Sequence, residues 1–104
     1  MPSHPQIASL LIDLEALLRN GGLWSDERPS AAALASTVPF AVDTLPLQQW
    51  LQFIFIPRLR ELLAAGLPMP ANCEILPVAE EAFDSKNREL FRVIAQLDKL
   101  ISEA

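Results

Sequence analysis

The start of the chain carries its clearest helical pattern. Apolar side chains recur at intervals of three and four, which places them within an arc of about 120° on a helical wheel. They are Ile7, Leu10, Leu11, Leu14, Leu17 and Leu18. Ser3 with Gln6 is typical of a capping box at a helix start. Asn20, Gly21 and Gly22 are expected to end the helix, because glycine readily adopts the left-handed conformation of a helix stop.

A second long helix is predicted from Pro46 to about Ala65. Proline suits the first turn of a helix, and Gly66 with Pro68 marks the end. Pro57 lies inside this helix and removes one backbone hydrogen bond. We therefore expect a kink or a break at that position.

The second helix is apolar over more than one side. One side of the wheel holds Trp50, Leu51, Ile54, Phe55 and Leu62, and the other holds Gln48, Gln49, Gln52 and Arg60. Phe53, Ile56 and Leu63 fall on or beside the glutamine side. A helix that is apolar nearly all round is either central in its domain or shared with a partner.

The segment between these helices is less regular. Leu23 and Trp24 are expected to fold back on the core, and Pro29 to open a short helix over 30–35. An extended segment held by apolar anchors is predicted next, at Pro39, Phe40 and Val42.

The C-terminal third predicts a loop over 67–76, a short helix over 77–83 and a last helix ending near Ser102. Asp84 or Ser85 is expected to cap that last helix. Its apolar arc consists of Leu90, Phe91, Val93, Ile94, Leu97, Leu100 and Ile101. This arc spans about 180°, so the helix should contact two neighbours.

The sequence shows neither an alternating strand pattern nor an internal repeat. It therefore predicts an all-α fold, a small helical bundle of three long helices and two short ones in a single domain over 1–104.

Charge and cysteine content narrow the classes of function. Thirteen acidic residues against eight basic ones give a net charge of −5, which makes the chain a poor general binder of nucleic acid. The single cysteine excludes an internal disulfide. Asp13 and Glu15 interrupt the first apolar stretch, so it does not resemble a secretory signal. The most apolar stretch, 50–67, holds three charged residues and should not span a bilayer. We expect a cytoplasmic location.

The stretch over 40–59, Phe-Ala-Val-Asp-Thr-Leu-Pro-Leu-Gln-Gln-Trp-Leu-Gln-Phe-Ile-Phe-Ile-Pro-Arg-Leu, resembles the signature of the YqcC-like family of small bacterial proteins. The matching elements are Asp43, Thr44, Trp50, Leu51, Gln52, Pro57 and Arg58. Leu-Glu-Ala-Leu-Leu over 14–18, Trp24 and the Leu-Pro-Met-Pro loop over 67–70 extend the resemblance over nearly the whole chain. It implies a helical protein without an established activity or catalytic residues. It also implies a gene beside that of a tRNA pseudouridine synthase, which suggests a partner by association.

Two charged residues of that stretch are interaction candidates. Asp43 is the only ionisable side chain from Pro29 to Pro57, a charge-poor segment that should be buried or cover an interface. It either binds a ligand or partner cation or, with Thr44, caps the second helix. Arg58 falls on the apolar side of the wheel, where a guanidinium needs a partner. That partner is Glu61, a carboxylate of another helix or a second subunit, unless the kink turns Arg58 into solvent.

Aromatic and basic side chains supply the remaining candidates. Trp50, Phe53, Phe55 and Ile56 either form a pocket or dimer face or belong to the core, and Leu63 extends such a face. Arg88, Arg92 and Lys99 form the only basic stripe, which either contacts RNA or an acidic partner or is a solvated face paired with Glu89 and Glu103.

His4 and Cys73 are too few for a metal site of histidine and cysteine ligands. We expect neither a cofactor, nor a metal site, nor catalytic residues. The sequence favours a non-enzymatic module that binds another protein or a second copy of itself. The alternative is an accessory factor that docks on a tRNA pseudouridine synthase or its RNA. Direct nucleic-acid binding is not favoured. The interaction candidates are Asp43, Trp50, Phe53, Ile56, Arg58 and Leu63.

Overall fold

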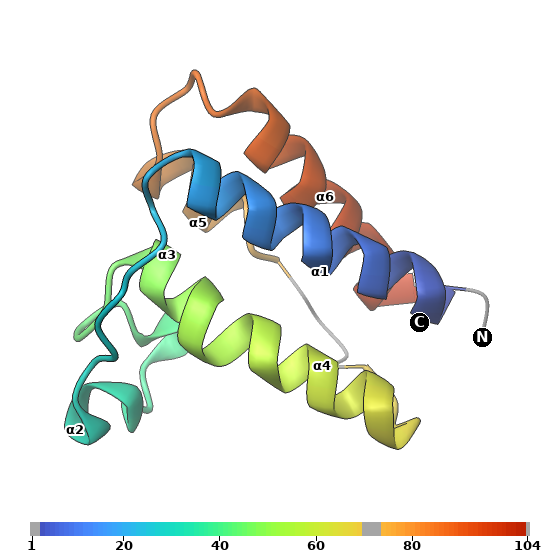
Figure 1. Ribbon diagram of the computed structural model, residues 1–104, viewed down its shortest axis with the longest axis horizontal. Helices are drawn as coiled ribbons and strands as arrows, with labels where there is room; N and C mark the ends of the chain where they lie inside the picture. The colour runs from blue at the N-terminus through green and yellow to red at the C-terminus, as the bar shows by residue number, and fades with distance from the viewer. Residues whose placement is uncertain (1–2, 70–73, 104) are drawn as a thin grey trace.

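A computed structural model describes residues 3–69 and 74–103, which form helices joined by loops (Figure 1). The elements in chain order are α1 (Ser3–Asn20), α2 (Ala31–Leu34), the 3-10 helix η1 (Pro39–Ala41), α3 (Leu47–Trp50), the π-helical turn η2 (Leu51–Phe55), α4 (Ile56–Ala65), α5 (Leu76–Ala82) and α6 (Arg88–Glu103). These two ranges contain no strand, so the predicted all-α class is confirmed.

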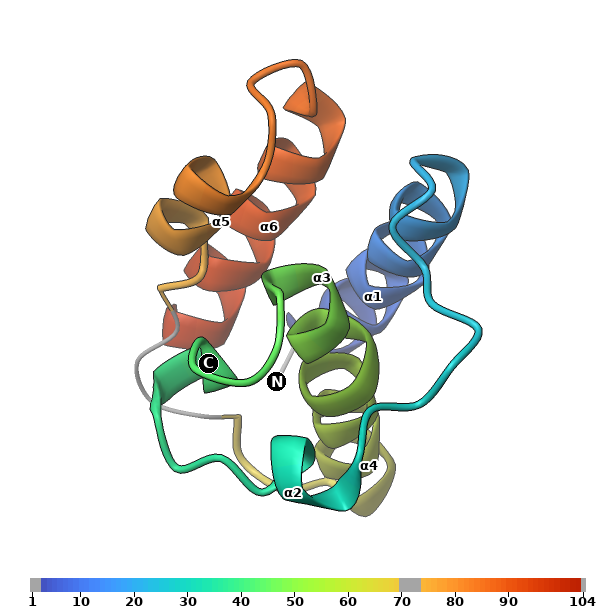
Figure 2. The ribbon, with the colours of Figure 1, turned by 90° about the vertical axis from the view of Figure 1, so that its left-hand side faces the viewer.

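Three long helices build the bundle. α1 runs antiparallel to α6, and α3, η2 and α4 follow one another as a single helix that we call the central helix (Figures 1 and 2). The apolar arcs of α1 and α6 meet the central helix and α5 in one core, as their periodicity predicts. The core residues with an exposed fraction of 1% or less are Ile7, Leu11, Leu14, Leu18, Leu51, Ile56, Leu59, Ile75, Ala79, Ile94, Leu97 and Ile101.

Glycine ends two of the helices as predicted. Gly22 has a φ of 72° and Gly66 a φ of 67°, both in the left-handed region. After α1, the amide of Leu23 donates to the carbonyl of Leu18 at 2.9 Å. After α4, the amide of Leu67 donates to a carbonyl five residues earlier, also at 2.9 Å. Each stop therefore satisfies carbonyls that the helix end leaves free. The Ser3 side chain of the predicted capping box lies outside the described residues.

Pro57 does not break the central helix, and the expected irregularity at this position takes the form of a wider turn. The residue before it, Ile56, donates its amide to the carbonyl of Leu51, five residues earlier, which makes η2 a π-turn. A proline has no amide hydrogen and its ring crowds the carbonyl four residues earlier. The wider turn accommodates that ring, and the extra residue it holds rotates the following residues by about 100° relative to a regular helix. The central helix begins at Leu47, one residue after the predicted start at Pro46.

The segment predicted as extended is instead a tight left-handed turn. Pro39–Ala41 forms η1, with a φ of 58° at Phe40 and 50° at Ala41. Left-handed backbone costs a non-glycine residue about 1–2 kcal/mol. The Phe40 ring is half-buried against the core, whereas Val42 is 59% exposed and anchors nothing. The charge-poor segment is therefore only partly buried.

The short helices lie close to their predicted positions. Ser30 caps α2 by accepting a hydrogen bond from the amide of Ala33 at 3.1 Å. α5 begins within one residue of the prediction, and residues 70–73 of the predicted loop lie outside the described ranges. The predicted cap of α6 is wrong, because α6 begins at Arg88. Asp84 instead accepts from the amide of Lys86 at 3.1 Å in the preceding turn.

Candidate interaction surface

The aromatic candidates of the central helix pack in a row with Phe40. The Trp50 ring lies edge-to-face against Phe40, with centroids 5.0 Å apart, and stacks on Phe55 at 5.3 Å. Phe55 is 6% exposed and belongs to the core, and Trp50 is half-buried. The row stabilises the left-handed turn at Phe40, because the ring that turn directs inward gains aromatic contacts.

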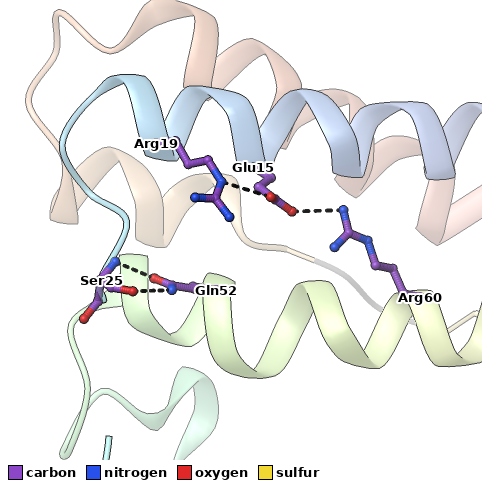
Figure 3. Close-up of polar contacts among 5 residues, drawn as sticks. All are labelled: Glu15, Arg19, Ser25, Gln52 and Arg60. Carbon is purple, nitrogen blue, oxygen red and sulfur yellow. Dashed lines mark hydrogen bonds and ion pairs between the residues drawn. The ribbon is translucent and has the colours of Figure 1, made fainter. Parts of the chain in front are cut away.

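Gln52 holds the loop after α1 against the central helix. Its side-chain oxygen accepts from the amide of Ser25 at 2.8 Å, and its side-chain nitrogen donates to the Ser25 carbonyl at 2.8 Å (Figure 3). Gln52 is 7% exposed, although the wheel placed it on the polar side. A buried amide needs partners for both its donor and its acceptor, and one residue of the loop supplies both.

Glu15 of α1 pairs with two arginines, Arg19 on the same helix and Arg60 on the central helix. Its carboxylate oxygens lie 3.0 Å from Nε of Arg19 and 3.1 Å from a guanidinium nitrogen of Arg60 (Figure 3). The hydrogen bond from Arg19 lowers the pKa of Glu15, partial burial raises it, and Arg60 lowers it further. The net effect is a pKa below the ordinary 4.5. No sequence pattern predicted this contact, because Glu15 and Arg60 lie far apart in the chain.

We predict that Glu15→Gln lowers the free energy of unfolding at pH 7 by up to about 1 kcal/mol, the range for ion pairs near the surface. A carboxylate whose pKa is lowered in the folded state stabilises the fold at pH values above its unfolded-state pKa. This stabilisation is lost as the pH falls through the folded-state pKa. The difference between parent and variant should therefore shrink below about pH 4.5. Urea unfolding from pH 3 to 7 measures it. Asp13→Asn, an exposed change on the same helix, should show no such trend.

The other apolar candidates of the central helix differ in exposure. Ile56, placed near the polar side by the wheel, is 1% exposed and lies in the core. Phe53 and Leu63 are half-buried. The Phe53 ring lies 5.9 Å from the guanidinium carbon of Arg28. The π-turn explains the misplacement of Ile56, since it rotates residues after Phe55 toward α1 and α6.

The two charged candidates are both on the surface. Arg58 is exposed and makes no ion pair with any described side chain, so of the predicted alternatives the turn into solvent is the one observed and the buried pairing is wrong. The rotation at the π-turn carries it away from the core. Asp43 is exposed and does not cap the central helix. It accepts a hydrogen bond from the Ser36 hydroxyl at 2.6 Å, while Thr44 donates to the carbonyl of Ala33 at 2.8 Å.

The basic stripe of α6 lies on the surface, and one of its three members is paired with a described carboxylate. Arg88, Arg92 and Lys99 are all exposed. Arg92 lies 3.8 Å from Glu89, which partly neutralises it. Arg92 and Lys99 also line two hollows along the contact of α1 and α6, which the sequence did not predict. The Glu103 side chain, the expected partner of Lys99, lies outside the described residues.

Neither a metal-binding group nor a membrane-spanning helix is found within the described residues. His4 is half-buried at the start of α1, and Cys73 lies outside the described residues. Within 3–69 and 74–103, histidine, cysteine, aspartate and glutamate form no group of three that could hold a metal ion. No helix in those ranges is long and apolar enough to cross a membrane.

Sequence comparisons relate the chain to small bacterial proteins. A family model described as tRNA pseudouridine synthase C matches residues 6–100. The uncharacterised protein YqcC of Escherichia coli K12 is 34% identical over 96% of this chain and 92% of its own length. An uncharacterised Haemophilus influenzae protein is 35% identical over 86% of this chain and 87% of its own length.

Two further comparisons add a longer relative and a solved fold. A protein named tRNA pseudouridine synthase C, from Pectobacterium carotovorum, is 37% identical over 69% of this chain, a match that covers 19% of that longer protein. The solution structure of YqcC from Escherichia coli superposes with a TM-score of 0.84 at 31% identity, over 99% of this chain and 91% of that one. Sequence and fold together show that the chain belongs to the YqcC-like family of small bacterial helical proteins.

Proposed function

We propose that this chain is a non-enzymatic binding module that docks on a tRNA pseudouridine synthase. One observation carries the proposal: a longer protein named tRNA pseudouridine synthase C contains a stretch 37% identical to this chain, which makes up 19% of it. The description of the matching family model agrees with this relation. A domain that occurs inside a longer chain is held beside the rest of that chain. A separate copy of the domain achieves the same proximity only by binding.

The character of the described surface supports binding rather than catalysis. Catalytic sites gather titratable groups with strongly shifted pKa values in a concave site. Here the carboxylate with a shifted pKa, Glu15, is held by two arginines that stabilise the fold. Arg58 and Asp43 lie on the surface. These observations on the described residues support the proposal of a binding module.

The test mixes the purified full chain with the purified tRNA pseudouridine synthase of the same organism. Isothermal titration should show saturable 1:1 binding with a Kd of about 1 μM or tighter. Size-exclusion chromatography with light scattering should show one complex in place of two species. Separate elution together with no heat of binding would refute the docking proposal.

The same experiment separates docking on the protein from docking on its RNA. Addition of tRNA to the chain alone should produce no binding, because the net charge of −5 opposes phosphate contacts. Binding of tRNA by the chain alone, weakened by salt and by Arg88→Ala with Arg92→Ala, would favour the RNA instead.

A further inference from the structure

The pair formed by α1 and α6 has one covered side and one open side. Glu15 projects from α1 toward Arg60 of the central helix. Asp13 and Leu17 lie two positions before and after Glu15, about 160° away from it around the helix. That side of α1 faces away from the central helix, and Figures 1 and 2 show no other helix over it.

Two neighbouring hollows follow this open side along the contact of α1 and α6. One, of about 500 Å³, is lined by Gln6, Ser9, Leu10, Gln96, Lys99 and Leu100. The other, of about 330 Å³, is lined by Asp13, Ala16, Leu17, Glu89, Arg92, Val93 and Gln96. Gln96 borders both hollows, so they lie next to each other, and we call the two together the α1–α6 groove.

Both walls of the α1–α6 groove have the spacing of a coiled-coil seam. Residues of α1 line it at intervals of four, three and four, and so do residues of α6. They are Gln6, Leu10, Asp13 and Leu17 on one wall and Glu89, Val93, Gln96 and Leu100 on the other. This 4-3-4 register places side chains along the line where a further helix packs, as knobs into holes.

The apolar surface along the groove is incompletely covered. Leu10, Leu17 and Leu100 are only half-buried. Half-buried leucines at heptad spacing fit an amphipathic helix that covers them.

Charges at the two ends of the groove define the chemistry of the occupant. One end of the groove is lined by Asp13, Glu89 and Arg92. Glu89 and Arg92 lie 3.8 Å apart and offset each other's charge, whereas Asp13 makes no ion pair with the described side chains. At the other end, the groove is lined by Lys99. A complementary helix carries a basic side chain over Asp13 and an acidic one over Lys99.

We infer that the α1–α6 groove binds an amphipathic helix of the partner synthase, with apolar residues at heptad spacing and these two charges. The inference rests on the proposed function and adds the surface that performs it. The synthase helix occupies the place of a fourth long helix beside α1 and α6. Contact with the half-buried leucines supplies the affinity, and the end charges orient the helix.

The decisive comparison uses two arginine substitutions at exposed alanines. Ala16→Arg places a long cation inside the groove, and Ala64→Arg makes the same change on α4, away from it. Isothermal titration with the purified synthase should give a Kd at least about tenfold weaker for Ala16→Arg, equivalent to about 1.4 kcal/mol. Ala64→Arg should stay within about twofold of the parent, and circular dichroism should show the same helicity in both variants.

A charge reversal tests the orientation separately. Asp13→Lys should weaken synthase binding, and unchanged binding in both Asp13→Lys and Ala16→Arg would overturn the groove assignment while the proposed function stands. Absence of binding by the parent chain refutes the proposed function itself. Sedimentation of the parent as a dimer that Ala16→Arg makes monomeric would assign the groove to a second copy and overturn the inference.

Discussion

Ile94→Ala is expected to lower the free energy of unfolding by about 2–5 kcal/mol, the largest stability effect that we predict for a single side chain. Ile94 is fully buried where α6 meets the rest of the core. Its truncation removes buried apolar surface and leaves a cavity that the surrounding helices fill only partly. The loss is a large fraction of the stability of a domain of this size. Urea unfolding, followed by circular dichroism at 222 nm, measures it.

Ile12→Ala is the matched control, because it makes the same chemical change inside a helix at a side chain that is 63% exposed. The intrinsic helix propensity changes equally in both variants, so their difference isolates burial. We expect a change within about 0.5 kcal/mol. A loss of similar size in the two variants would contradict the assignment of α1 and α6 faces described above.

Gln52→Glu is expected to lower the free energy of unfolding by about 2–3 kcal/mol more at neutral pH than at about pH 4. The reason is that a buried charge costs more than an unpaired neutral group. A protonated carboxyl both donates and accepts, so it can replace the amide against Ser25. An ionised carboxylate only accepts, and it then faces the Ser25 carbonyl across the 2.8 Å contact. Burial and this carbonyl raise the pKa of the introduced carboxyl.

The sign of the pH effect follows from that raised pKa. The variant should approach the stability of the parent at pH 4 and fall below it as pH rises through the unfolded value of about 4.3. Gln52→Leu should lose about 1–3 kcal/mol at every pH, since it leaves both Ser25 groups without a partner. Gln49→Glu, one turn earlier, serves as a control with the same added charge. A constant deficit for Gln52→Glu across pH would contradict the contact.

The helices and most of their ends could be predicted from the sequence. The periodicity of α1 and α6 places each buried arc correctly, because these helices are regular and each residue turns the helix by a constant angle. Gly22 marks the end of α1 and Gly66 the end of α4, through a local backbone preference. These signals depend on neighbouring residues only, so a single sequence contains them.

The faces of the central helix could not be predicted with a regular wheel. The wheel is correct up to the π-turn and is displaced by about 100° after it, so it placed Arg58 inside and Ile56 outside. Pro57 was the available signal. A missing amide permits a kink, a break or a wider turn, and the packing of Ile56 and Leu59 in the core favours the wider turn.

Asp98 illustrates what a regular pattern hides. Its carboxylate accepts hydrogen bonds from the amides of Ile75 at 3.0 Å and Leu76 at 2.8 Å, and so caps α5 from α6. In the sequence Asp98 is simply a polar position of the last helix. Its role depends on the packing angle of two helices, which no local pattern encodes.

The sequence by itself determined the fold class, the long helices and the inner faces of α1 and α6, because hydrophobic periodicity and glycine stops act between neighbouring residues. Tertiary structure alone decided the left-handed turn at Phe40, the partners of Gln52 and Glu15, and the groove between α1 and α6. Each of these brings together atoms from distant parts of the chain. Their energies depend on distances and burial that are fixed only when the helices pack.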